Sequence, residues 1–155
     1  MNAALFGLGA LSVFAEDLDA STSFYRDRLG LQAVHQDENS AVFGLGNTLV
    51  NLLRVEAARD LIAPATVAPP DMGVRMQLTA WVEDVDAVCA LLQSRGVVML
   101  TGPVDRPWGK RTAAFADPSG TVWEIAQDIP NEASGRRHNR DPGTTTRIVA
   151  RRLPR

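Results

Sequence analysis

Glu124 is the residue of this chain whose type and position most clearly suggest chemistry. It lies in 122–127, where apolar and polar residues alternate as in a β-strand, so it shares a face with Val122 and Ala126. A carboxylate on an enclosed face must be solvated, neutralised or paired. Two interpretations are open: a fixed partner inside the protein holds Glu124, or it receives a cationic or hydrogen-bond-donating group of a ligand. Burial that raised its pKa would also make it a general base.

Three aromatic side chains are candidates for holding a planar or cationic molecule. Phe14 and Trp81 each stand three residues before an aspartate, and Trp108 lies in a turn between Pro107 and Gly109. Aromatic faces stack on other π systems and attract cations. The alternative is that these rings fill a core or cover a sheet edge.

The segments that contain Phe14 and Trp81 are two copies of one pattern. Residues 13–20 read VFAEDLDA and residues 80–87 read AWVEDVDA, at an offset of 67 residues. Each copy ends an alternating stretch and opens a helical one. The chain is therefore predicted to contain two half-modules of the same fold.

Each module is predicted to fold as βαβββ, which makes the chain an α+β protein. In the first module we expect a strand at 9–15, a helix at 19–29 with Asp19 or Ser21 as its N-cap, and strands at 32–36, 40–45 and 48–55. In the second we expect a strand at 74–82, a helix at 86–94, and strands at 97–101, 111–117 and 122–127. Glycines are expected to end the helices, at Gly30 and Gly96. Aligning Thr48 with Thr121 pairs Asn51 with Glu124.

The two modules are expected to form a single domain over 1–129. They occupy 1–56 and 74–129, and 57–73 should be an irregular linker because it holds Pro64, Pro69 and Pro70. Residues 130–155 form a tail with seven arginines against two acidic residues and without apolar periodicity, which predicts disorder.

The composition is that of a soluble globular protein, with 45% hydrophobic and 22% charged residues. Cys89 is the only cysteine and lies in an apolar helical stripe, so we expect a core thiol in a cytoplasmic protein. No apolar run is long enough to span a bilayer. The basic tail has no aromatic residues to stack on bases, so neither a membrane nor nucleic acid is an expected partner.

Several short motifs in the two halves carry a family resemblance. They are 15–21 (AEDLDAS), 24–27 (FYRD) and 29–31 (LGL) in the first half, and 82–86 (VEDVD), 106–109 (RPWG), 115–120 (FADPSG) and 123–124 (WE) in the second. They resemble the vicinal oxygen chelate (VOC) superfamily, which includes glyoxalase I, the bleomycin and fosfomycin resistance proteins and the extradiol dioxygenases. The resemblance implies a curved, cup-like mixed sheet with helices outside, and a homodimer with sites at or near the subunit contact.

Enzymes of this superfamily bind a divalent metal through side chains on the first and last strands of each module. The resemblance places these four positions at Ala10, Asn51, Gln77 and Glu124. Ala10 has no donor atom, and Asn51 and Gln77 offer only neutral amide oxygens. Because Glu124 alone is anionic, we expect weak metal binding and no cofactor.

The sequence therefore predicts a binding protein most similar to the metal-free bleomycin resistance proteins. Capture of a small aromatic or cationic molecule, as in antibiotic resistance, would be its function. The expected ligand-binding residues are Phe14, Asn51, Gln77, Trp81, Trp108 and Glu124. One alternative is an enzyme, a glyoxalase-like lyase or isomerase or a dioxygenase, that uses a degenerate metal site or Glu124 alone as its catalytic group. Another is a pure interaction module.

Overall fold

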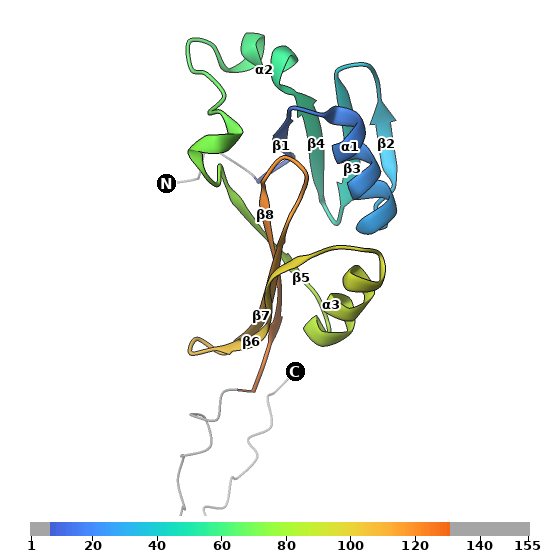
Figure 1. The fold of residues 1–155 in the computed structure, drawn as a ribbon, viewed down its shortest axis with the longest axis vertical. Coiled ribbons are helices and arrows are strands. Elements are labelled where there is room, and N and C mark those ends of the chain that lie inside the picture. The colour runs from blue at the N-terminus through green and yellow to red at the C-terminus, as the bar shows by residue number, and fades with distance from the viewer. Residues whose placement is uncertain (1–6, 131–155) are drawn as a thin grey trace, which may run out of the picture.

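A computed structural model describes residues 7–130 of the protein. The predicted tail, apart from Pro130, lies outside the described residues. Two βαβββ modules follow one another along the chain, and Figure 1 shows the first above the second. The strands are β1 (Ala10–Ala15), β2 (Ala33–Gln36), β3 (Ser40–Leu45), β4 (Thr48–Arg54), β5 (Gln77–Trp81), β6 (Met99–Arg106), β7 (Lys110–Ala116) and β8 (Val122–Asp128). The helical elements are α1 (Leu18–Ser23), η1 (Phe24–Arg28), α2 (Val55–Ile62), η2 (Pro70–Met72) and α3 (Val85–Ser94).

The eight strands form two four-stranded mixed sheets, one in each module. Sheet A has the order β1-β4-β3-β2 and sheet B the order β5-β8-β7-β6. The first strand of each module runs parallel to the last one, and the other neighbours are antiparallel. This confirms the predicted α+β class and the βαβββ modules. Because β1 and β5 are edge strands, each sheet has a free edge formed by the first strand of its module.

Equivalent residues are paired in the two sheets. Ser12 pairs with Asn51 in sheet A, and Thr79, which follows Ser12 by the repeat offset, pairs with Glu124 in sheet B. The alignment that paired Asn51 with Glu124 is therefore confirmed. The sequence repeat corresponds to a repeat of backbone pairing.

Both α1 and α3 begin at an aspartate of the repeated motif. The Oδ1 atoms of Asp17 and Asp84 each accept the backbone N–H three residues later, at 2.9 Å in both helices. The prediction of Asp19 or Ser21 as N-cap is wrong. Asp17 has the extended backbone from which a side chain reaches the unpaired N–H groups of a first helical turn.

The first helix is not a continuous α-helix over 19–29. After Ser23 it becomes the π-helical turn η1, in which residues five apart are hydrogen-bonded. Phe24 and Tyr25 lie in this turn, and their rings contact Phe115 and Trp123 of sheet B at centroid distances of 6.2 and 6.0 Å. The turn thus provides an aromatic link between the modules.

The segment between the modules is partly helical. The prediction of an irregular linker over 57–73 is wrong for its first residues, because α2 covers 55–62, packs against β1 and β4, and buries Ala58. The prolines begin only at Pro64, and the residues before it include good helix formers. None of the helices in residues 7–130 is long and apolar enough to cross a membrane.

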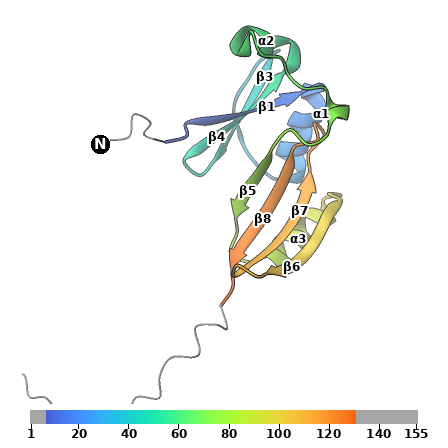
Figure 2. The same cartoon turned by 90° about the vertical axis from the view of Figure 1, so that its left-hand side faces the viewer.

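One hydrophobic core joins the modules. It contains side chains from the helix-covered faces of both sheets, including Val13, Phe43, Leu52, Leu78, Phe115 and Trp123. Cys89 belongs to it and is 3% exposed, which confirms the predicted core thiol. Figure 2 shows sheet B with α3 behind it. The opposite face of each sheet, called the open face below, carries Ser12, Phe14 and Asn51 in sheet A and Gln77, Thr79, Trp81 and Glu124 in sheet B.

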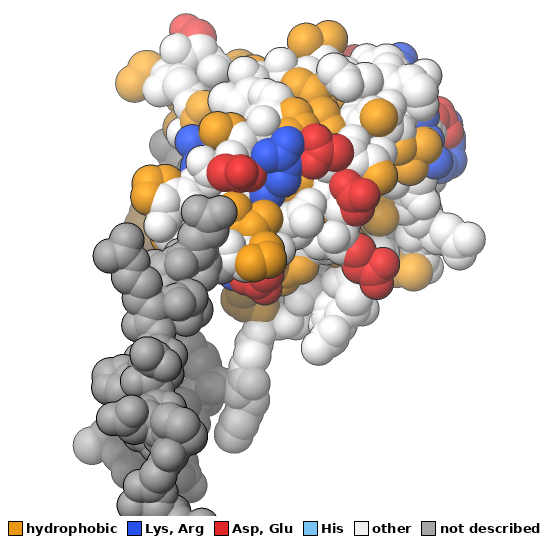
Figure 3. Space-filling model, turned by 90° about the horizontal axis from the view of Figure 1, so that it is seen from below, with side chains coloured by type: hydrophobic (Ala, Val, Ile, Leu, Met, Phe, Trp, Pro, Cys, Tyr) orange, Lys and Arg blue, Asp and Glu red, His pale blue; other side chains and the backbone are white. Residues whose placement is uncertain are grey.

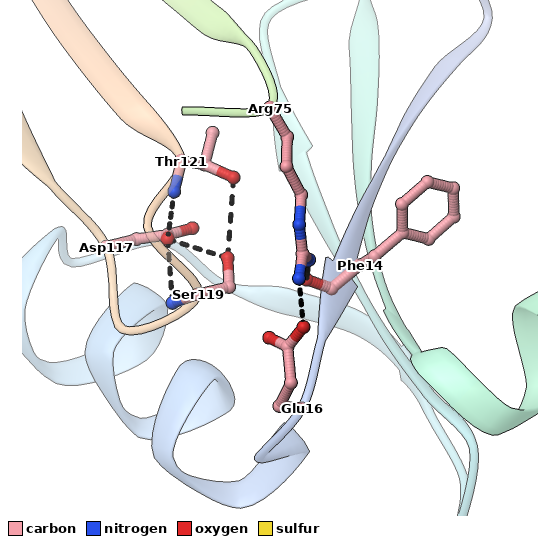
Figure 4. Close-up of polar contacts among 6 residues, drawn as sticks. All are labelled: Phe14, Glu16, Arg75, Asp117, Ser119 and Thr121. Atoms are coloured by element: carbon pink, nitrogen blue, oxygen red, sulfur yellow. Dashed lines mark hydrogen bonds and ion pairs between the residues drawn. The ribbon is translucent and has the colours of Figure 1, made fainter. Parts of the chain in front are cut away.

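A buried carboxylate links the modules. Asp117 is 5% exposed, and its Oδ1 accepts the N–H of Ser119 (2.9 Å), the hydroxyl of Ser119 (2.7 Å) and the N–H of Thr121 (2.9 Å; Figure 4). Its Oδ2 accepts the Tyr25 hydroxyl of the first module at 2.7 Å. The Tyr25 oxygen in turn accepts Nε1–H of Trp123 at 3.0 Å. Both carboxylate oxygens therefore have partners, as a buried charge requires.

Arg75 forms a second link at the beginning of sheet B. It donates to the carbonyl oxygen of Phe14 at 3.1 Å and pairs with the carboxylate of Glu16 (Figure 4). The Arg75 side chain is only 13% exposed. It therefore fastens the end of β1 to the segment that leads into β5.

A third link joins the C-terminal ends of the two helical segments. Arg28 and Arg95 stand 67 residues apart, and each donates to the backbone carbonyl of the other, Arg95 at 3.2 Å. Gly30 and Gly96 follow these arginines with φ of +73° and +83°, which confirms their predicted role at the helix ends. A side chain at Gly96 would also collide with the Arg28 guanidinium.

We predict that Tyr25→Phe destabilises the protein by about 1–3 kcal/mol, because Asp117 then lacks a partner for one buried oxygen. Urea denaturation measures the loss. Thr22→Val is the matched control, since the Thr22 hydroxyl is buried without a hydrogen-bond partner and its removal should change stability by less than about 0.5 kcal/mol. Equal losses in both variants would contradict the assignment.

The same contact predicts a sensitivity to alkali. Burial, together with the adjacent Asp117 carboxylate, raises the pKa of Tyr25 well above its ordinary value. The unfolded chain releases this proton near pH 10 and the folded chain does not, so stability is unaffected below about pH 10 and falls as the pH rises further. Tyr25 is the only tyrosine, so tyrosinate absorbance reports it alone. Tyrosinate should appear only as far-UV circular dichroism is lost, and ionisation near pH 10 in the folded protein would refute this.

Candidate ligand-binding site

The six predicted ligand-binding residues are divided between the two sheets. Phe14 and Asn51 lie on the open face of sheet A, and Gln77, Trp81 and Glu124 lie on the open face of sheet B. Trp108 lies in the turn between β6 and β7. Within residues 7–130, no hydrogen bond connects the sheet A pair with the sheet B group. The structure thus brings three of the six residues together on one sheet face.

Glu124 is half-buried in the second strand of sheet B. Thr79, its partner on β5, donates a hydroxyl hydrogen bond to Glu124 Oε1 at 3.1 Å. Over the described part of the chain, no basic side chain forms an ion pair with Glu124, and neither Gln77 nor Asn51 is hydrogen-bonded to it. The carboxylate is therefore oriented by one neutral donor and can accept further hydrogen bonds.

Small side chains form the middle of the open face of sheet B. Trp81 on β5 pairs with Ala126 on β8, which pairs with Thr112 on β7. In the next row Glu124 pairs with Ala114. This part of the sheet leaves room above it between the larger residues that surround it.

Trp81 and Trp108, which lie near these small side chains, each have a basic neighbour. Lys110 Nζ lies 4.5 Å from the centroid of the Trp81 ring, and the Arg106 guanidinium carbon lies 5.9 Å from that of Trp108. Trp81 and Trp108 nevertheless remain 67% and 65% exposed. Their rings are thus available at the surface, but one side of each contacts a cation of the chain itself.

A groove of about 430 Å³ follows the free edge of β5. It is lined by Leu8, Leu11, Leu45, Gly46, Asn47, Thr48, Leu78, Thr79, Ala80, Trp81 and Trp123. Its volume lies within the range of sites for small organic molecules, and most of its lining residues are apolar or aromatic. Thr79 lines the groove and bonds Glu124, so the groove adjoins the open face of sheet B.

The helix-covered side of sheet B has a different electrostatic character. Arg111 donates to Asp86 and Asp105, at 2.6 Å to each, and the bond with Arg111 lowers the pKa of Asp86. Figure 3 shows acidic and basic side chains next to one another among hydrophobic ones at this end of the molecule. Arg111 is therefore neutralised and lies on the opposite side of the sheet from Glu124.

The residues at the four expected metal positions do not fit a divalent metal. Ala10 and Asn51 lie in sheet A, whereas Gln77 and Glu124 lie in sheet B. No group of three His, Cys, Asp or Glu side chains in residues 7–130 could hold an ion. Asn51 Oδ1 is buried without a partner, but an amide oxygen is a neutral ligand. The four positions provide only one anionic donor, Glu124, where a catalytic site needs several strong ligands.

Two residues that contact this group, Thr79 beside Glu124 and Asp128 beside Lys110, were not among the six predicted ligand-binding residues. Thr79 could have been found, because the repeat aligns it with Ser12 and so places it beside Glu124. Asp128, which pairs with Lys110, gave no such signal, because the contact depends on the register between β7 and β8.

Comparison with known families agrees with this architecture. The sequence model described as "Glyoxalase/Bleomycin resistance protein/Dioxygenase superfamily" matches residues 7–125, which include both modules as far as Ile125 of β8. The chain belongs to this superfamily. The match covers the groove, the open faces and the turn that holds Trp108.

Solved structures of the glyoxalase superfamily share the fold. A glyoxalase/bleomycin resistance protein/dioxygenase from Nocardioides is 21% identical with a TM-score of 0.74, over 94% of this chain and 93% of its own. A lactoylglutathione lyase from Agrobacterium tumefaciens is 21% identical with a TM-score of 0.64, over 77% and 92%. A glyoxalase-related enzyme from Fulvimarina pelagi is 21% identical with a TM-score of 0.66, over 79% and 88%. No protein of curated function matches the chain.

Proposed function

We propose that this member of the glyoxalase superfamily captures a small organic molecule without a metal cofactor. The observation that carries the proposal is the donor set at the four family positions, where Glu124 is the only anionic side chain. Alanine and two amides cannot hold a divalent ion against water with the strength that catalysis requires. Glu124 is then free to accept a hydrogen bond from an organic ligand.

The surroundings of Glu124 support a ligand with an aromatic or apolar body and a donor or cationic group. The groove beside β5 offers apolar walls, and Trp81 offers an exposed ring at its border. Thr79 orients the Glu124 carboxylate next to this groove. Such a molecule would be held by stacking, burial and one charge-assisted hydrogen bond.

Capture alone would make the protein useful to the cell, as in resistance by sequestration. This role requires affinity but no reacting group, which agrees with a site that offers a single carboxylate and aromatic walls. We place this activity in the cytoplasm, where the reduced core thiol of Cys89 is stable.

We predict that an aromatic or cationic natural product stabilises the protein in the presence of EDTA. Thermal shift measurements over a library of such molecules, each with EDTA or with Zn²⁺, Ni²⁺, Mn²⁺ or Fe²⁺, give the test. A ligand at a hundredfold excess over its Kd stabilises the folded state by about 2.7 kcal/mol. Glu124→Gln and Trp81→Leu should each lower the affinity for the stabilising molecule about five- to tenfold, as measured by calorimetry.

Glu83→Gln is the matched control for the carboxylate, since Glu83 is exposed and lies outside the site. This variant should bind the stabilising molecule as tightly as the wild type does. Stabilisation that needs a metal and disappears in Glu124→Gln would overturn capture in favour of a metal-dependent enzyme.

We also propose a homodimer. Phe14 and Asn51 are not connected to Glu124 within the described chain, and Trp81 and Trp108 are largely exposed. A second copy that placed its sheet A against the open face of sheet B would bring both groups of predicted residues to one site and cover Trp108.

Light scattering should therefore give twice the chain mass of 16.8 kDa. Trp108→Glu should shift the protein toward the monomer, because a charge would be buried at the contact. Leu61→Glu, at a 72% exposed position on α2, is the control and should remain dimeric. A monomeric wild type would refute the dimer.

A further inference from the structure

The contact between Lys110 and Trp81 has the composition of a ligand subsite. Lys110 Nζ lies 4.5 Å from the centroid of the Trp81 ring and also pairs with the carboxylate of Asp128. An aromatic face together with a carboxylate is the combination that recognises an alkylammonium group. In this structure the ammonium group is that of the protein's own lysine.

The Lys110 contact can be displaced. The side chain of Asp128 is 81% exposed and Trp81 is 67% exposed, so water reaches both partners. Exposed ion pairs and exposed cation–π contacts are individually weak. An ammonium ligand that also gains contacts elsewhere on the protein can therefore compete with Lys110.

Trp81 connects this contact with the groove. The same indole ring lines the groove beside β5, together with Leu8 and Leu78. A molecule whose ammonium group replaced that of Lys110 could extend its apolar part along the groove. The subsite thus has room next to it for the rest of a ligand.

The second cation–π contact on this face lacks the carboxylate. Arg106 lies 5.9 Å from the Trp108 ring and donates to the Thr112 hydroxyl at 2.9 Å. Among residues 7–130, no acidic side chain pairs with Arg106. The complete recognition set is therefore found at Trp81, and Arg106 provides a matched comparison.

We propose that Trp81 and Asp128 form an ammonium-binding subsite, and that Lys110 is an intramolecular competitor that lowers its affinity. The proposal rests on the proposed capture function and specifies its ligand class as amines or quaternary ammonium compounds with an apolar body. When Lys110 occupies the subsite for most of the time, the apparent affinity equals the intrinsic affinity multiplied by the fraction of time that the subsite is free.

The test is a titration of the full chain with choline, followed by NMR through the indole N–H resonance of Trp81. This resonance is assigned by its absence from the spectrum of Trp81→Phe. Lys110→Met keeps most of the length of the side chain and removes its charge, and it should bind choline roughly fivefold more tightly than the wild type. The neutral isostere 3,3-dimethylbutan-1-ol should show no such gain. Adding Asp128→Asn to Lys110→Met should abolish the gain.

Arg106→Met is the control and should bind choline as the wild type does. Equal choline affinity in wild type and Lys110→Met, or an equal gain for the neutral alcohol, would overturn the subsite. None of these side chains belongs to the buried core, and unchanged circular dichroism verifies folding. If Lys110→Met gains choline affinity but no library molecule stabilises the wild type, the subsite stands and the capture function fails. If a library molecule stabilises the wild type but Lys110→Met gains no choline affinity, the capture function stands and the subsite is rejected.

Discussion

The arrangement of the two modules depends on the buried carboxylate of Asp117. A charge in this position requires partners for both oxygens, and the partners come from the 117–121 turn and from Tyr25 of the other module. Tyr25 can reach Asp117 because the π-helical turn η1 carries it toward sheet B. Together with the Arg75 and Arg28–Arg95 links and the shared core, this contact holds the β5 groove and the open faces in their relative positions.

Much of the architecture could be predicted from the sequence because the chain repeats itself. Alternation and the offset of 67 residues predicted both modules, and aligning Thr48 with Thr121 predicted which strand positions correspond. These patterns are local, since they depend on strand periodicity and on glycine at helix ends. The two wrong predictions also concern local features. Asp17, and not Asp19 or Ser21, is the N-cap of α1, and the prolines after α2 led to the prediction of an irregular segment where the chain forms a helix.

The site was less predictable than the fold. The sequence could place Glu124 and Trp81 on one face. It could not show that Lys110 covers part of the Trp81 ring, because that contact joins β7 to β5 across the intervening strand β8. The groove beside β5 depends on how the β3–β4 turn of one module approaches the other. Such distances between modules are set by packing of the whole core, and no short pattern in the sequence records them.

The contact between Tyr25 and Asp117 makes the halves of this duplicated chain unequal. The repeat aligns Tyr25 with Leu92, and aligning the closing strands sets Asp117 opposite Gly44. One half provides the phenol and the other the carboxylate. An artificial chain built from two first halves would contain two tyrosine hydroxyls without a carboxylate acceptor. One built from two second halves would contain two buried carboxylates without the tyrosine donor. The ancestral symmetry is therefore retained in the backbone, but it can no longer be restored by copying either half.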